Sequence, residues 1–217
     1  MKLRVLAIDT SGEVCSLALL TPEGLYEQRH RSAEGHAHLL FPQVEALLRE
    51  AGLGVADIDC FAAASGPGSF TGVRVALSAV KGLAEATGKA AAGVSNLQAL
   101  AWHGSAKLRA PLIDARRQEV YGAVYDGELR LVQPETVGPV EAWLASLPEG
   151  EVEIVTADSL PLPAGHPRVC RVSRELARAV AHIAAGRLLA GLAAEAAALE
   201  ANYVRRSDAE LSWKEVG

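Results

Sequence analysis

The sequence is poor in aromatic residues and in cysteine, and both shortages limit what the protein can be. Phe, Trp and Tyr make up 5% of the 217 residues although half of the chain is hydrophobic, so its core must be built from Ala, Val and Leu. The three cysteines, Cys15, Cys60 and Cys170, are odd in number and lack the short pair spacing that holds zinc. This pattern indicates a reducing compartment, and we expect a cytoplasmic protein.

Long apolar runs and an excess of positive charge are missing as well. The apolar stretch before Asp9 covers only residues 5–8, which is too short for a signal-peptide core or a membrane span. The formal net charge is -5, whereas non-specific binding to nucleic acid comes from Lys and Arg that neutralise phosphates. We therefore expect no membrane association, and contact with RNA only through a local patch or a basic partner.

The hydrophobic pattern of the first half predicts alternating strands and helices. We expect strands over residues 3–8, 15–20, 25–30, 58–64 and 91–94, and helices over 38–51, over 71–87 and from Ser95 toward Lys107. Three strands in a row at the start predict a meander, so this half is an α/β lobe.

The second half begins in the same way as the first. A strand that ends in Asp114 is followed by a hairpin with the turn Asp126-Gly127, and we expect strands over residues 112–114, 120–125, 129–132 and 152–156 and helices over 140–147 and 173–199. Gly186 and Gly191 weaken that last helix, which can bend or divide. We interpret the chain as a degenerate duplication with lobes over 1–108 and 109–217, in which the C-terminal helix or tail can pack back onto the first lobe.

The segment "DTSG" after the first strand has the residue types of a phosphate-binding hairpin. Asp9 offers a carboxylate for a metal or a water, Thr10 and Ser11 offer hydroxyls, and Gly12 allows a tight turn. The alternative is an ordinary turn in which Asp9 and Ser11 satisfy backbone donors.

The segment "ASGPGSFTGVRVALSAVKGLA", residues 64–84, looks like a phosphate loop but fits none of the specific motifs. A P-loop would have Lys and then Ser or Thr after Gly72, where Val73 and Arg74 stand. A dinucleotide fingerprint would have glycine in place of Thr71, and an esterase elbow would have glycine in place of Pro67. What remains is a glycine-rich start to a helix, mildly suited to an anion.

The helix that follows has a narrow polar side. Its polar residues fall within about 60° of one another at 100° per residue: Arg74, Ser78, Lys81 and Glu85. Such a helix should be covered on two sides, one of which is its own sheet. The other side is a row of small residues that allows a second helix to come close: Val75, Ala79, Gly82 and Ala86. That cover is either the helix near residues 40–51 of the same chain or a partner subunit.

Two further polar groups have two readings each. The segment from Asp114 through Arg116, Arg117 and Glu119 to Tyr121 is either a salt-bridged hairpin mouth or a ligand or interface site. The tail pair Arg205 and Arg206 is either solvated or docked elsewhere on the molecule. His36 and His38 lie two apart, a spacing that points them away from each other on a helix, so no metal site is predicted there.

Four segments together resemble the TsaB family, also called YeaZ: "LAIDTSGEVCSLAL", "SGPGSFTGVRVALSAVKGLA", "IDARRQEVY" and the tail from "YVRR" to "WK". The resemblance covers the whole chain in order. It implies the two-lobed fold of sugar kinases, heat-shock chaperones and actin (ASKHA), with an intact N-lobe and a shortened C-lobe. It also implies a role in making threonylcarbamoyladenosine in tRNA beside the related catalytic subunit TsaD.

The resemblance implies that this chain is not the catalyst. TsaD holds a metal through an H-x-x-x-H motif, and the corresponding "GVSNLQALA" has Asn96 and Leu100 at those positions. We expect no catalytic residue, no metal site and no cofactor; the alternative is a nucleotide site that is shared with a partner or left as a vestige. Its vestigial phosphate-binding residues would be Asp9, Thr10, Ser11, Gly66, Gly68 and Asp114.

In the family, the partner surface is the pair of N-lobe helices, so the resemblance implies that this surface docks to a TsaD-like subunit and forms a homodimer when the chain is alone. The resemblance also implies that a TsaE-like ATPase is recruited and that tRNA is contacted only through the complex. The residues expected on that surface are His38, Pro42, Phe70, Thr71, Arg74, Val75, Ser78, Ala79, Gly82 and Ala86. The alternative functions are an ATPase or small-molecule kinase that uses Asp9, Ser11 and Asp114, and a metalloprotease, which would need a bound metal.

Overall fold

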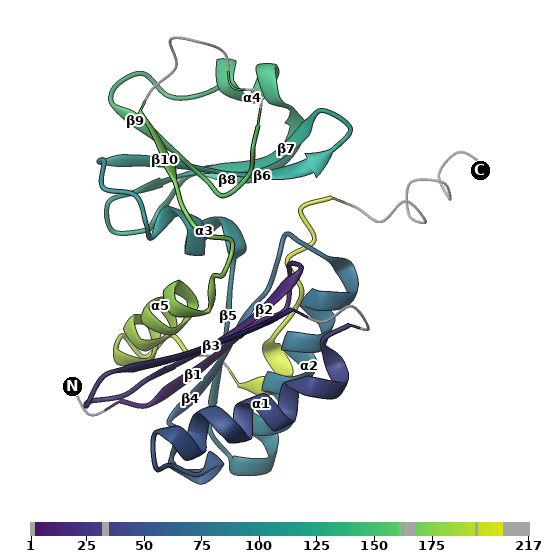
Figure 1. Ribbon diagram of the computed structural model, residues 1–217. Coiled ribbons are helices and arrows are strands. Elements are labelled where there is room, and N and C mark those ends of the chain that lie inside the picture. Colours follow the sequence, from purple (N-terminus) through teal and green to yellow (C-terminus); the bar gives the residue numbers. More distant parts are fainter. Residues whose placement is uncertain (1–2, 32–34, 161, 163–167, 194, 206–217) are drawn as a thin grey trace, which may run out of the picture. The chain divides into compact units, whose positions relative to one another are not determined.

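The computed structural model describes residues 3–31, 35–160, 162, 168–193 and 195–205, and the chain divides into two compact units (Figure 1). Unit 1 combines residues 1–99 with 173–201, and unit 2 combines residues 100–172 with 202–217. Each unit contains one five-stranded mixed sheet. The division after residue 99 lies before the boundary expected between residues 108 and 109, and the C-terminal helix belongs to unit 1. The assignment of these units to two lobes of one superfamily fold stays a prediction.

The sheet of unit 1 has the strand order β3-β2-β1-β4-β5. Its strands are β1 (Val5–Asp9), β2 (Val14–Leu20), β3 (Leu25–Arg31), β4 (Cys60–Ala64) and β5 (Ala90–Val94). The first three form the predicted antiparallel meander, and β4 and β5 continue parallel to β1. All residues of β1 and β4 are buried, as expected for strands that are covered on both faces.

Helices cover both faces of this sheet (Figure 1). One face carries α1 (Ala37–Glu50) and α2 (Phe70–Thr87), and the other face carries α5 (Ala177–Leu189). The short helix η1 (Val55–Asp57) follows α1 and leads into β4. The predicted helix over residues 173–199 is therefore divided. It ends at Leu189 because Gly191 takes a left-handed conformation with a φ of 70°, and a separate short helix, η2 (Ala196–Ala198), follows.

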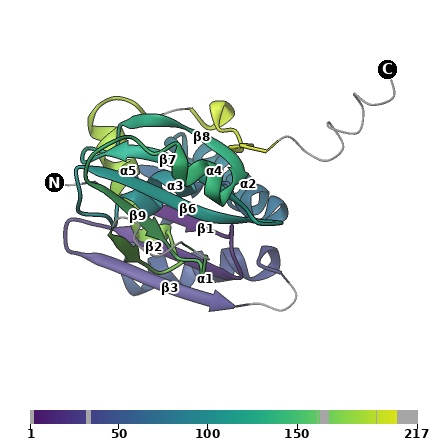
Figure 2. The same cartoon turned by 90° about the horizontal axis from the view of Figure 1, so that it is seen from above.

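Unit 2 repeats the strand order of unit 1. Its elements are β6 (Leu108–Arg116), β7 (Glu119–Asp126), β8 (Leu131–Pro139), α4 (Val140–Ala145), β9 (Val152–Thr156) and β10 (Val169–Arg171). Read from β8, the order is β8-β7-β6-β9-β10, and the pairings have the same senses as in unit 1: two antiparallel, then two parallel. Figure 2 shows most of these strands from above. The helix α3 (Asn96–Ala101) spans the division between the units.

Several predicted elements have different bounds. Strand β6 starts at Leu108 instead of residue 112, β8 continues to Pro139 instead of ending at residue 132, and β10 was not predicted. The helix that begins near Ser95 stops at Ala101 instead of reaching Lys107, and the Glu153 carboxylate holds the chain beyond it by accepting hydrogen bonds from Ser105 N and Ala106 N. Strand β8 starts at Leu131 rather than at residue 129 because the Asp126 side chain accepts hydrogen bonds from the backbone of the turn as far as Arg130 N. Among the described residues, no helix is long and apolar enough to cross a membrane.

Candidate functional site

A groove lies between α1 and α2 in unit 1. It encloses about 460 Å³ and is lined by Ala37, Leu40, Phe41, Phe70, Thr71, Arg74, Val75, Ser78 and Ala79. Phe41 on α1 and Phe70 on α2 are 54% and 51% exposed, which is unusual for phenylalanine in an isolated chain. A concave apolar surface with exposed aromatic side chains is typical of a site where another molecule binds.

The spacing of apolar residues on α1 explains why the groove is open. Leu40, Val44, Leu47 and Leu48 form the stripe that packs into the core of unit 1. Phe41 lies outside that stripe and points away from the core side. Opposite it, α2 presents the small side chains of Ser78 and Ala79, and no bulky group from the described part of the chain fills the space.

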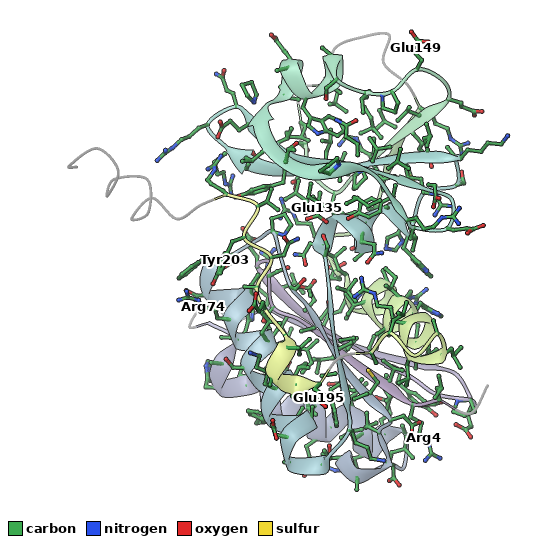
Figure 3. The ribbon with its side chains drawn as sticks, turned by 180° about the vertical axis from the view of Figure 1, so that it is seen from behind. Arg4, Arg74, Glu135, Glu149, Glu195 and Tyr203 are labelled. Atoms are coloured by element: carbon green, nitrogen blue, oxygen red, sulfur yellow. The ribbon has the colours of Figure 1, made fainter. Side chains whose placement is uncertain are left out.

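Arg74 is the charged residue that lines this groove. Its guanidinium carbon lies 3.6 Å from the centre of the Phe70 ring, a cation–π contact that orders both side chains on the first turns of α2. Figure 3 shows Arg74 at the outer side of α2. The apolar groove thus carries a positive charge on one wall.

The ten residues expected on the partner surface lie on α1 and α2. Six of them line the groove: Phe70, Thr71, Arg74, Val75, Ser78 and Ala79. The other four, His38, Pro42, Gly82 and Ala86, are exposed on the same two helices. Sequence reasoning missed Phe41, and the available signal was an aromatic residue outside the buried stripe of its helix.

A second segment of the same chain also covers α2. The short helix η2 packs against α2, and its first residue, Ala196, and the following Leu199 are buried in the core cluster of unit 1. The sequence predicted either α1 or a partner as the second cover of this helix. The C-terminal return segment supplies part of that cover, while Gly82 and Ala86 stay exposed.

The Asp9 hairpin is buried and its polar groups bond inside the protein. Asp9 Oδ1 accepts hydrogen bonds from Ser11 N at 2.9 Å and Ser11 Oγ at 2.6 Å, and Oδ2 accepts one from Leu176 N at 3.1 Å. Burial raises the pKa of Asp9 above its usual range, and the hydrogen bonds from Ser11 and Leu176 oppose that rise. Ser11 Oγ also accepts a hydrogen bond from Asn96 Nδ2 at 2.7 Å.

The glycines of the loop before α2 are needed for close packing against this hairpin. A Cβ on Gly72 would lie 1.9 Å from Thr10 O, and one on Gly68 would lie 2.9 Å from Ser11 O. Gly66 bonds through N and O to Asn96. These residues do not fit a phosphate group as they stand, because their hydroxyls and carboxylate are already bonded and the glycine space is filled by backbone.

Asp114, the sixth residue of the predicted phosphate set, belongs to unit 2. Its carboxylate accepts a hydrogen bond from Arg116 N at 2.8 Å and lies 3.4 Å from Arg116 Nη1, while Asp114 N donates to Asp158. This pattern is that of a charged hairpin mouth, one of the two interpretations that the sequence left open.

The structure brings the tail and the β6–β7 hairpin of unit 2 together. Arg205 donates to Glu119 and to Ala115 O, and its guanidinium lies 5.7 Å from the centre of the Tyr121 ring. Arg205 is therefore docked rather than solvated, whereas Arg206 lies outside the described residues. The hairpin itself turns through three left-handed residues, Arg116, Arg117 and Gln118.

Burial and neighbouring charges shift the pKa of four further groups in unit 1. Burial raises the pKa of Cys15 to about 12 and that of Cys60 to about 11, so both thiols are protonated at neutral pH. Burial and the nearby Arg178 lower the pKa of His182. A hydrogen bond from Arg178 lowers the pKa of Glu27.

Asn96, at the position of the first metal-binding histidine in the resembled motif, is buried and hydrogen-bonded to Ser11 Oγ. Leu100, at the position of the second histidine, is also buried, and its side chain has no atom that could bind a metal. Over the part of the chain that the structure describes, no group of three or more His, Cys, Asp and Glu side chains is arranged to hold a metal ion.

Comparison with known proteins first gives the class of protein to which the chain is similar. The model of the family described as "TsaD: tRNA N6-adenosine threonylcarbamoyltransferase" matches residues 30–173. In solved structures, YeaZ from Pseudomonas aeruginosa aligns with a TM-score of 0.79 and 31% identity, covering 93% of this chain and 99% of that one.

Curated relatives give the particular family. The "tRNA threonylcarbamoyladenosine biosynthesis protein TsaB" of Escherichia coli is 37% identical over 57% of this chain and 55% of its own length. The protein of that name in Bacillus subtilis is 34% identical over 67% of this chain and 66% of its own. The matches thus span about half to two thirds of these relatives. The chain belongs to the TsaB (YeaZ) family, which confirms the resemblance seen in its sequence.

Proposed function

We propose that this chain is a non-catalytic subunit in the synthesis of threonylcarbamoyladenosine next to the anticodon of tRNA. It binds a TsaD-like catalytic subunit through the groove between α1 and α2 and stabilises the active arrangement of that subunit. The relatives are named for this biosynthesis. The observation that carries the docking role is the pair of half-exposed phenylalanines, Phe41 and Phe70, on opposite sides of an apolar groove.

The groove suits a helical partner surface. Full burial of a phenylalanine side chain contributes about 1.5–3 kcal/mol, so Phe41 and Phe70 can act as the aromatic anchors of an interface. The small residues Ala79, Gly82 and Ala86 let the backbone of a partner helix approach α2 closely. This combination supports helix packing between two subunits.

The wider assignment follows from family membership and the repeated topology. The identical strand order of the two units supports a duplicated, two-lobed ASKHA-like fold with an N-lobe that includes α1 and α2 and a shortened C-lobe. We further propose a homodimer when the chain is alone, recruitment of a TsaE-like ATPase, contact with tRNA only within the complex, and a cytoplasmic location. No residue is proposed as a catalyst.

The hairpin geometry supports this assignment over an ATPase or kinase. Asp9 and Ser11, which would have to face a nucleotide phosphate, bond to each other, to Asn96 and to Leu176 N. Opening that network would leave a carboxylate in the interior without its hydrogen bonds, which is costly. Titration of the isolated chain with ATP tests the point, because tight binding with turnover that Asp9→Ala abolishes would refute the subunit assignment.

The docking role is tested by co-purification with the TsaD-like subunit of the same source. We expect Phe41→Ser to weaken binding at least about 10-fold, because about 1.4 kcal/mol of apolar burial is lost. The matched control is Leu189→Ser on α5, which removes a similarly exposed apolar side chain (59%) from the opposite face of the sheet. Equal binding by both variants would show that the groove is not the partner site.

A further inference from the structure

We propose that Thr10, Ser11 and Asn96 are positioning residues for partner binding: together they hold the first turn of α2 so that its wall of the groove is formed before a partner arrives. We call these three residues the α2 clasp. This inference rests on the proposed docking function. It assigns a role to the Asp9 hairpin, which has the residue types of a phosphate-binding hairpin.

Thr10 and Ser11 bond directly to the start of α2. Thr10 Oγ1 donates a hydrogen bond of 2.6 Å to Gly72 O, and Ser69 N donates one of 2.8 Å to Ser11 O. The approach is so close that any side chain at position 72 would collide with Thr10 O. Two residues of the hairpin therefore fix both the N-cap and the first turn of the helix.

Asn96 fixes the loop that leads into this turn. Its Oδ1 accepts a hydrogen bond from Gly66 N at 3.0 Å, and its Nδ2 donates to Pro67 O at 3.0 Å and to Ser11 Oγ at 2.7 Å. Asn96 N also donates to Gly66 O at 2.8 Å. The amide thus joins the hairpin to the loop and uses its oxygen and both of its donor hydrogens.

The outer side of the first turn of α2 has little packing of its own, because Phe70 and Thr71 are exposed. On the inner side Gly72 and Val73 are buried, and the clasp fixes the turn together with that core packing. The clasp residues are buried, with exposures between 0% for Thr10 and 9% for Ser11, and so they cannot touch a partner directly. Their effect on binding must act through the geometry of the helix, and a preformed surface loses less conformational entropy when it binds.

The experiment compares two threonine-to-valine variants that preserve side-chain shape. Thr10→Val removes the hydroxyl that bonds to α2. Thr156→Val is the matched control, because Thr156 is also 0% exposed and its Oγ1 donates to a backbone carbonyl, that of Leu112, at 2.9 Å in unit 2. Thr10→Ser restores the hydroxyl. The dissociation constant for the TsaD-like subunit is measured by calorimetry well below each melting temperature, together with hydrogen exchange of the amides of residues 70–74.

We expect Thr10→Val to weaken binding about 10-fold and to accelerate exchange at residues 70–74, while Thr156→Val leaves both unchanged and Thr10→Ser binds within about 2-fold of the original chain. Should Thr10→Val fold poorly, Ser11→Ala, which removes the acceptor of Asn96, provides the same comparison. Equal binding by Thr10→Val and Thr156→Val overturns the clasp. If Phe41→Ser also binds normally, the docking surface itself is refuted, so the two failures are distinguishable.

Discussion

Replacement of Gly82 by arginine should raise the stability of the isolated chain while abolishing its docking. Gly82 lies on the exposed side of α2, and a Cβ built there would meet no atom within 4 Å. Arginine is favoured over glycine in a helix interior by about 0.7 kcal/mol. For a chain of this size, that gain corresponds to an increase of about 2 °C in melting temperature.

The effect on docking has the opposite sign. The row of Ala79, Gly82 and Ala86 is the part of α2 where a partner helix would approach most closely, and an arginine there would be buried without a counter-charge. We expect a loss of about 2–4 kcal/mol, which corresponds to about 30- to 1,000-fold in the dissociation constant. Gly186→Arg is the control, because Gly186 is also an exposed helical glycine with no atom near its Cβ, but it lies on α5.

The assay combines thermal unfolding of the isolated variants, at concentrations where the chain is monomeric so that loss of the proposed homodimer does not lower the melting temperature, with calorimetric titration against the TsaD-like subunit. Both variants should melt at a higher temperature than the original chain, and only Gly82→Arg should fail to bind. Equal affinity of the two arginine variants would refute the placement of the interface. Lower melting temperatures for both would refute the reasoning from open space and helix propensity.

Three further outcomes test other parts of the structure. Gly122→Ala places a Cβ 2.3 Å from the Trp143 ring, so it should cost about 1–3 kcal/mol, visible as a lower urea midpoint with altered tryptophan fluorescence; an unchanged midpoint would contradict this packing. At pH 8 a thiol reagent should modify Cys170 faster than Cys15 and Cys60, because those two are buried and Cys170 is only partly buried, although burial and Glu153 raise the pKa of Cys170 as well. Three equally fast thiols would contradict that difference in burial. The pKa of His182 in the folded chain lies below the ordinary 6.5, so the unfolded chain binds a proton at this residue more readily and stability falls as the pH drops below 6.5. His182→Gln should therefore flatten the fall in melting temperature between pH 7 and 5. An equal fall in both chains would show that His182 does not cause it.

Local patterns predicted most elements because their causes are local. Alternating and continuous apolar runs predicted nine of the ten strands found in the described residues, all but β10. The Asp126-Gly127 pair predicted a hairpin that the structure contains. The bounds were less accurate where a side chain from elsewhere intervenes. Helix α3 is shorter than predicted, and Glu153, some 50 residues away, bonds to the backbone just beyond it. Such a contact leaves no periodic signal near Ser95.

The candidate site was predictable in part. The narrow polar side of α2 predicted that this helix needs cover on two sides, and the family resemblance placed the expected partner residues on α1 and α2. Sequence reasoning did not find the exposed position of Phe41 or the cover provided by η2, because both depend on how segments far apart in the chain pack. An aromatic residue on a helix reads equally as core or as surface until its neighbours are known.

The sequence by itself determined the alternation of strands and helices, the repeated start of the two halves and membership of the TsaB family. Each of these depends only on the residue types and their order along the chain. The meaning of the glycines in "SGPGSFTG" was decided by tertiary structure alone. In isolation they suggest a binding loop for phosphate, yet at Gly68 and Gly72 a side chain would collide with the backbone of Thr10 and Ser11. Close approach between segments some 60 residues apart is a property of the packed molecule, and no local pattern carries it.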